Sequence, residues 1–211
     1  GREPDEDRYN FDLAPLDSYS ARLSYMPTRN WVFQVSGGQL TEAEPPHDGE
    51  PAKDVRRLTA SGIYHRALPR EGNWATTVAW GQNREDEVNS SGFLVETNLR
   101  LADRDAILGR FETAQKSADD LVIPLETTEL FLLRKIQVGY ERSLPAFRSL
   151  VLGVGGSVSL NFTPSELRPF YGDNPGAGFA VFVTLRPKRM EMMSHGMSPG
   201  PAPASVANRH R

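Results

Sequence analysis

The residues with the clearest capacity for chemistry in this 211-residue chain lie near its C-terminal end. The stretch MEMMSHGM, residues 190–197, holds four methionines and one histidine. Thioether sulfurs beside an imidazole suit Cu(I) better than zinc or magnesium. The sequence therefore predicts a Cu(I) site formed by Met190, Met192, Met193, His195 and Met197. The alternative is a tail whose methionines bind nothing.

A second set of chemically capable residues consists of charged and amide side chains that alternate with apolar ones. Its members are Arg22, Gln34, His65, Glu96, Asn98, Arg100, Arg110, Glu112, Lys135, Gln137 and Glu141. Burying so many ionisable groups in a packed interior would cost too much free energy. We expect them to line a lumen, as ion-pair ladders or pore lining. A catalytic carboxylate pair is the lesser alternative, because no Ser/His pairing accompanies it.

Several classes of function are disfavoured by what the sequence lacks. It has no cysteine, so disulfides, thiolate metal sites and cysteine nucleophiles are excluded. It contains no nucleotide-binding loop, metalloprotease motif or nucleophile elbow. The net charge is −3 and the basic residues are scattered singly, which gives nucleic acid no basic stripe to bind. We expect neither an enzyme nor a nucleic-acid-binding protein.

The stretch SLVLGVGGSVSLNF, residues 149–162, shows the kind of element that must position the polar side chains. Its large apolar residues occupy even positions, and glycine, serine or asparagine occupies most odd ones. This period of two predicts a β-strand and not a helix. Similar periods predict nine strands, near 18–25, 31–39, 57–65, 73–81, 91–100, 106–114, 129–141, 149–162 and 178–186.

The connections between these strands alternate in length. Residues 26–30, 66–72, 101–105 and 142–148 form short connections, and residues 40–56, 82–90, 115–128 and 163–177 form long ones. Outer-membrane barrels have short periplasmic turns and long external loops. We therefore predict an all-β, antiparallel up-and-down transmembrane β-barrel, or the C-terminal part of one.

Aromatic residues gather where the predicted strands end. Tyr25, Trp31, Tyr64, Trp74 and Tyr140 lie beside short connections, and Tyr19, Trp80, Phe93, Phe162 and Phe179 lie near long ones. Amphipathic rings favour the headgroup level of a bilayer, so two girdles are expected. Ordinary enrichment of aromatic residues in strands is the alternative.

The chain accordingly divides into three regions. Residues 1–17 are expected to form an external loop that follows a missing upstream strand, and residues 18–186 form the barrel strands. Residues 187–211 form a tail that contains Met, His, Pro and Ala and emerges in the periplasm. Pro187 ends the last strand because proline cannot donate a hydrogen bond to a ladder.

Turn positions also predict which residues face each other across neighbouring strands. The predicted pairs are Glu96–Arg110 and Asn98–Leu108 across residues 101–105, and Tyr140–Leu150, Val138–Leu152 and Lys135–Gly155 across residues 142–148.

Arg134 conflicts with the alternating pattern. It shares its parity with Leu132 and Ile136, which would point it into lipid. Either it lies near the membrane boundary and extends toward the headgroups, or a bulge in FLLRK shifts the phase of the strand.

Three segments resemble part of a known protein family. They are GREPDEDRYNFDLAPLDSYSARLSY, the strand NWATTVAWG with the charged residues after it, and SELRPFYGDNPGAGFAVFVTLRP. They are similar to the C-terminal part of a poorly characterised family of bacterial outer-membrane, porin-like β-barrel proteins. The resemblance implies a barrel in the outer membrane of a Gram-negative bacterium, with further strands upstream. It also implies a link to copper handling, because members carry Met/His-rich ends that MEMMSHGM resembles.

The expected function is passive or metal-related passage of small solutes across a lipid bilayer. The main alternative is a soluble up-and-down β-barrel or sandwich that binds a ligand or a protein partner. A barrel enzyme that acts on lipids or esters is the third candidate.

Overall fold

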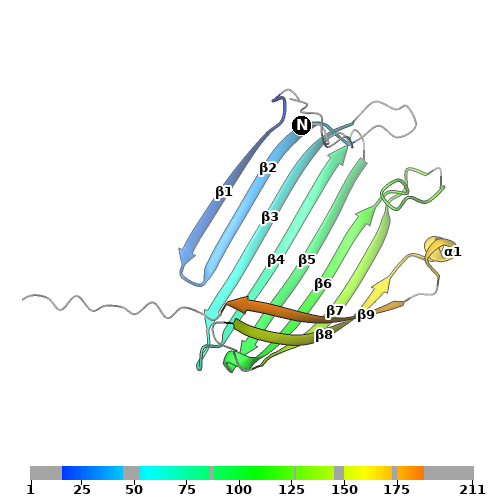
Figure 1. The fold of residues 1–211 in the computed structure, drawn as a ribbon. Helices are drawn as coiled ribbons and strands as arrows, with labels where there is room; N and C mark the ends of the chain where they lie inside the picture. The colour runs from blue at the N-terminus through cyan, green and yellow to red at the C-terminus, as the bar shows by residue number, and fades with distance from the viewer. Residues whose placement is uncertain are drawn as a thin grey trace, which may run out of the picture.

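The computed structural model describes residues 16–44, 53–85, 88–125, 127–144, 150–172 and 175–187. These form one antiparallel sheet in which every strand pairs with its neighbours in sequence (Figure 1). The strands are β1 (Tyr19–Thr28), β2 (Trp31–Glu44), β3 (Lys53–Ala67), β4 (Asn73–Glu85), β5 (Val88–Leu101), β6 (Asp105–Lys116), β7 (Phe131–Ser143), β8 (Leu150–Phe162) and β9 (Gly176–Pro187). The predicted all-β, up-and-down sheet of nine strands is confirmed.

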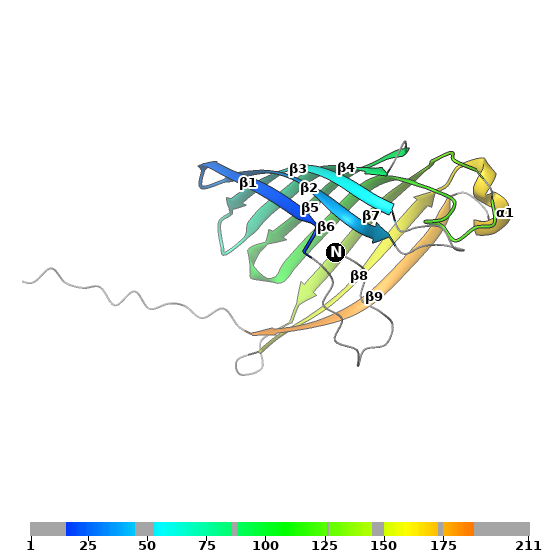
Figure 2. The same cartoon turned by 90° about the horizontal axis from the view of Figure 1, so that it is seen from above.

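The sheet is curved but not closed. Figure 2 shows it curled into a trough, with β1 and β9 at its two rims. In the described part of the chain, β1 pairs only with β2, and β9 pairs only with β8. The structure does not show whether the sheet spans a membrane. The predicted tail beyond residue 187, with its Cu(I) ligands, and residues 1–15 of the predicted external loop lie outside the described residues.

The pairing register separates the side chains into two faces. Residues directly opposite each other in an antiparallel pair point to the same side, and successive residues point to opposite sides. We call the first side the concave face; it carries the even-numbered residues of β1, β2, β5, β6 and β9 and the odd-numbered residues of β3, β4, β7 and β8. The remaining strand residues form the convex face.

Burial identifies which face lies inside the curve. Side chains on the concave side of a curved sheet converge and shield one another. From Trp31 to Val35, for example, the convex-face residues are exposed and the residues between them are half-buried, and β9 shows the same alternation at most positions. Phe179 is 86% exposed and Val181 is 77% exposed, so the apolar face is the outer one.

One connection differs from the predicted alternation of short and long loops. Residues 82–90 were expected to form a long charged loop, but β4 continues to Glu85 and β5 begins at Val88. The polar residues pair in unbroken register, with Arg84 opposite Asn89. The ladder of β4 and β5 continues through these polar residues, so composition alone placed the boundary wrongly.

The register prediction succeeds at one turn and fails at the other. Across the 3-10 turn η1 (Ala102–Arg104), Glu96 lies opposite Arg110 and Asn98 opposite Leu108, as predicted. Across residues 144–149, the predicted pairs are wrong, because the partners of Tyr140, Val138 and Lys135 are Gly156, Val158 and Asn161.

Glycines account for the second register. The observed pairing places Tyr140 opposite Gly156 and Glu141 opposite Gly155. A Cβ atom added at Gly155 would lie 2.6 Å from the Tyr140 carbonyl oxygen and 2.6 Å from the Phe182 ring. The shift from the predicted register is an even number of residues, so no side chain changes face.

Arg134 lies on the convex face without a bulge. The β6–β7 pairing is continuous, with Arg134 opposite Thr113, and Phe162 is its partner on β8. It is the fourth residue of β7, near the end of the sheet that carries the long connections. Of the two predicted explanations, the structure therefore excludes the phase shift.

A small apolar core lies between the two longest described connections. Ala118, Ile123, Phe131 and Leu167 are buried there, and Leu121, Leu125 and Leu133 pack against them. Leu167 belongs to the turn η2 (Ser165–Leu167), which precedes the short helix α1 (Arg168–Tyr171). The Tyr171 hydroxyl donates a hydrogen bond to the Leu121 carbonyl oxygen at 3.1 Å, which ties the two connections together.

Shortening Leu167 tests this core. Leu167 is 0% exposed, so Leu167→Ala should lower the local stability of the two connections by about 2–4 kcal/mol. Hydrogen exchange of the amides in 117–125 and 163–172 should accelerate accordingly, with the strands unchanged. Asp119→Ala is the control, because Asp119 is an exposed residue of the same connection and its loss should change stability by about 0.5 kcal/mol or less. Equal effects of the two changes would show that the connections are not held by this core.

Candidate functional site

The concave face gathers all the polar strand residues that the sequence predicts to line a lumen. Its eleven predicted members are Arg22 on β1, Gln34 on β2, His65 on β3, Glu96, Asn98 and Arg100 on β5, Arg110 and Glu112 on β6, and Lys135, Gln137 and Glu141 on β7. The strands position them because unbroken pairing carries one parity across the whole sheet. The shared face is a finding, and the lumen that it would line is taken up below as a proposal.

An ion-pair cluster lies on β5 and β6. The Arg110 guanidinium donates from Nε and Nη2 to one oxygen of Glu112, at 3.1 and 2.9 Å, and from Nη1 to Glu96 at 3.2 Å. All three side chains are between 37% and 51% exposed, so water screens the cluster. A single guanidinium thus serves two carboxylates, and the predicted Glu96–Arg110 pair is part of a triad.

Neutral hydrogen bonds connect other concave-face residues across strands. Gln34 Nε2 donates to Ser24 Oγ at 3.1 Å, and Gln137 Nε2 donates to Ser157 Oγ at 3.0 Å. The hydroxyls of Ser36 and Thr59 are 2.7 Å apart. These pairs fix side chains on the concave face without adding charge to it.

Several predicted residues have no such side-chain partner within the described part of the chain. Arg22, His65, Asn98, Lys135 and Glu141 make no side-chain hydrogen bond or ion pair there. Lys135 lies opposite Glu112 in the ladder but is not ion-paired with it. Water must solvate these polar and charged groups, which agrees with a wet concave face.

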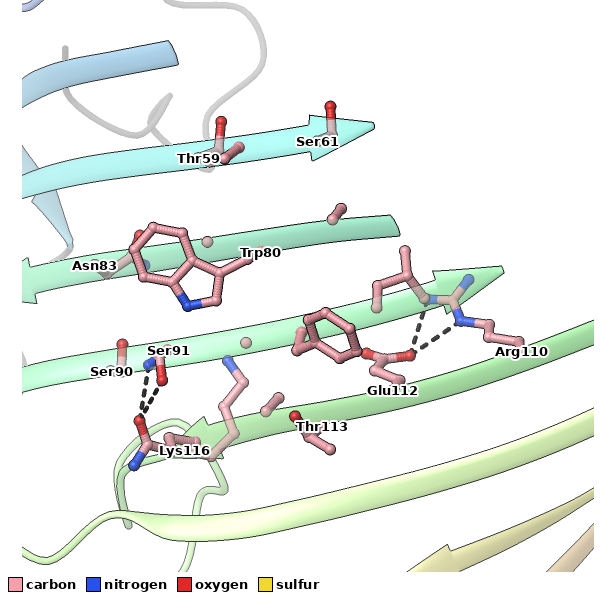
Figure 3. A pocket seen from close by; sticks show the side chains of 18 residues that line it. Thr59, Ser61, Trp80, Asn83, Ser90, Ser91, Arg110, Glu112, Thr113 and Lys116 are labelled. Carbon is pink, nitrogen blue, oxygen red and sulfur yellow. Dashed lines mark hydrogen bonds and ion pairs between the residues drawn. The ribbon is translucent and has the colours of Figure 1, made fainter. Parts of the chain in front are cut away.

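The concave face is hollowed over β3 to β6. A depression of about 450 Å³ is lined by Thr59, Ser61, Arg110, Glu112 and Lys116, among other residues (Figure 3). Its floor includes Ala79, Gly81, Gly92 and Ala114, whose small side chains leave the space open. A second hollow, of about 240 Å³, borders Glu112, Lys116, Lys135 and Asn161. Both hollows therefore meet at Glu112 and Lys116.

Sequence reasoning missed three cations in the regularly paired part of this face. Arg57, Lys116 and Arg186 share the concave parity. Lys116 fell in a segment that was predicted to be a loop, while Arg57 and Arg186 stood at the ends of predicted strands. These three cations alternate in step with the polar residues beside them, and this alternation was the signal that could have identified them. Using it depends on knowing where each strand ends.

A metal site is not assembled in the described ranges. There, no group of three or more His, Asp or Glu side chains is placed to hold an ion, and the predicted Cu(I) ligands lie beyond residue 187. Over the same ranges, no helix has both the length and the apolar character needed to cross a membrane.

Comparisons with known proteins give no relative from which a role could be transferred. No protein-family model matches the chain, and no curated protein or solved structure matches it. The chemistry of the face must therefore be argued from its own residues.

The triad geometry gives a stability prediction. Glu96→Ala removes one partly exposed contact and leaves Arg110 bound to Glu112, so we expect a loss of about 0.2–1 kcal/mol. Arg110→Ala should cost more, because it leaves two carboxylates side by side without their cation. Chemical unfolding of both single variants and the double variant measures the coupling. A Glu96 change that costs as much as the Arg110 change would contradict the shared-guanidinium arrangement.

Proposed function

We propose that this chain forms the wall of a porin-like β-barrel in the outer membrane of a Gram-negative bacterium, and that small solutes pass along its concave face. The observation that carries the proposal is the reversed polarity of the sheet. Its exposed outer face is apolar, and its half-buried inner face is charged. A protein surrounded by water has the opposite arrangement, whereas a barrel that encloses water within lipid has this one.

The apolar face is continuous from one rim of the sheet to the other. One row of directly paired residues runs from Tyr25 through Phe33, Gly62, Val78, Val95, Phe111, Ile136 and Leu160 to Ala177. Exposing this surface to water would cost much free energy. Monomeric proteins accordingly seldom expose contiguous apolar patches larger than a few hundred Å². Lipid chains would cover it without that cost.

Charged residues bound the apolar band at both ends. On β7, Arg134 and Arg142 enclose Ile136, Val138 and Tyr140 on the convex face. Eight residues span roughly 27 Å along a strand at about 3.4 Å per residue. A strand tilted by about 40° would convert this length into roughly 21 Å, close to the ~25 Å apolar band of outer-membrane barrels.

Aromatic side chains form part of a girdle at the end with the short turns. The ring centroids of Trp31 and Tyr64 are 4.9 Å apart, and those of Tyr64 and Trp74 are 5.4 Å apart. The polar edges have partners as well, because Trp74 Nε1 donates to Thr97 Oγ1 at 3.0 Å and the Tyr140 hydroxyl donates to Asp105 at 2.5 Å. Rings with one wet edge are suited to the headgroup level of a bilayer.

The soluble alternatives require a partner that covers the whole convex face. Among the described residues, the small core around Leu167 packs against Phe131 and Leu133, which have the concave parity of β7, so this core leaves the convex face uncovered. The concave face gives the enzyme alternative no specific support, because Glu96 and Glu112 share the Arg110 guanidinium, and Glu141 lies apart from them, opposite Ala106 and Gly155. Passage remains our preferred function.

Two neighbouring residues of β8 provide a test. Val158 lies on the convex face and is 65% exposed, while Ser159 lies on the concave face opposite Gln137. Val158→Arg should destabilise the membrane-inserted form by about 2–4 kcal/mol, and Ser159→Arg should have little effect. The fraction that folds into phosphatidylcholine vesicles, measured by heat-modifiable gel mobility, reports the difference.

The same pair separates the proposal from its soluble rival. If water covered the convex face, an arginine at residue 158 would be tolerated and would raise solubility in detergent-free buffer. A Val158→Arg variant that folds in plain buffer as well as the unmodified protein would refute the membrane assignment.

A further inference from the structure

We propose that the concave face makes the passage selective for small anions, such as halide, phosphate and carboxylate ions. This inference rests on the proposed function, because it names the class of solute that the same face admits.

The charge balance of the face is positive. We count the strand residues that are paired without a register shift, and take His65 as neutral. The cations are Arg22, Arg57, Arg100, Arg110, Lys116, Lys135 and Arg186. The carboxylates are Glu85, Glu96, Glu112 and Glu141. Seven cations against four anions leave an excess of three positive charges.

This excess does not follow from composition, because the whole chain carries a net charge of −3. Cations exceed carboxylates on the convex face of the strands as well, where Arg56, Arg66, Arg84, Arg134 and Arg142 stand against Asp105, but in the proposed barrel only the concave face borders the water-filled space. A wall that lies in a medium of low dielectric constant focuses such a charge into the water-filled space and raises the local concentration of counter-ions.

Several of the cations keep their charge uncompensated. The Arg57 Nε donates to the neutral Asn83 amide oxygen at 2.9 Å, and the Arg186 Nη2 donates to the neutral Ser143 hydroxyl at 2.8 Å. Lys135 and Arg22 have no carboxylate partner in the described part of the chain. Glu96 and Glu112, in contrast, both contact Arg110. The central carboxylates are therefore partly neutralised, while cations remain available on both sides of them.

The available cations are also suited to oxyanions. A guanidinium offers donors in a planar fork that matches carboxylate and phosphate, and an ammonium offers a compact point charge. Lys135, which has no carboxylate partner in the described ranges, borders the hollow of about 240 Å³ beside Glu112, together with Lys116, which is ion-paired with Asp120 at 3.5 Å. An anion that moves along the concave face could accept hydrogen bonds from the Lys135 ammonium there, and no carboxylate would have to leave Lys135 first.

Adjacent arginines on opposite faces allow a matched experiment. Arg57 faces the concave side and Arg56 the convex side of β3. The full-length protein and its variants are inserted into planar bilayers of neutral phosphatidylcholine, and the reversal potential is measured in a tenfold KCl gradient. The unmodified protein should pass chloride in preference to potassium. Arg57→Glu and Lys135→Glu should each lower the chloride-to-potassium permeability ratio by about twofold or more, whereas Arg56→Glu should leave it unchanged.

Ionic strength gives a second readout from the same measurement. The Debye length falls from about 10 Å at 0.1 M salt to about 3 Å at 1 M. The preference for chloride should therefore weaken as the mean KCl concentration rises across this range. The milder Arg57→Gln and Lys135→Gln variants, checked for heat-modifiable mobility, guard against failure of the glutamate variants to fold.

The outcomes separate this inference from the proposed function. Channels that prefer potassium, or that shift equally with Arg56→Glu and Arg57→Glu, would overturn anion selectivity and leave the porin assignment standing. Folded, inserted protein that conducts no ions would overturn both.

Discussion

Uninterrupted antiparallel pairing is the constraint on which this structure depends. Because side chains alternate along a strand, a slip of one residue between any two strands would move every later side chain to the other face. The two register shifts in the described sheet lie near strand ends, between Tyr25 and Thr28 and between Leu40 and Glu44. Everywhere else the parity is carried from β1 to β9, and the separation of charge from apolar surface follows from it.

The sheet has little of the apolar core that stabilises a domain in water. Its backbone is hydrogen-bonded in the ladders except along the outer edges of β1 and β9, and its main buried apolar cluster joins two connections at one end. In the proposed barrel, the free energy that burial usually supplies would come from lipid on the convex face. Small residues such as Gly81 and Gly92 line the concave hollow, where side chains need not pack closely.

Much of the fold could be read from the sequence because period two is a strong signal in long strands. The nine strands, the common face of the polar residues and the register across residues 101–105 all follow from it. The register between β7 and β8 could not be derived in this way. Which residues face each other there depends on which positions tolerate a close approach of the neighbouring strand, and period two does not report this. Gly155 opposite Glu141 is such a contact, and it depends on the third strand through Phe182.

The candidate site was only partly predictable for a related reason. Its residue types were visible, but Lys116 was hidden because strand β6 continues past the point where the apolar alternation fades. The sharing of Arg110 between two carboxylates was also hidden, since Glu112 is its neighbour on the same strand face rather than its partner in the ladder. Alternation identifies a face, whereas contacts within that face depend on rotamers.

The open rims of the trough have a consequence for size. A sheet that closes on itself fixes its radius by two quantities, the number of strands and the stagger accumulated around the circumference. The eight pairings from β1 to β9 contribute a definite part of that stagger. In the proposed barrel, the remainder belongs to whatever pairs with the outer edges of β1 and β9, including any strands upstream. The bore of that barrel, and the tilt of every strand in it, would thus be decided by how these two edges are joined.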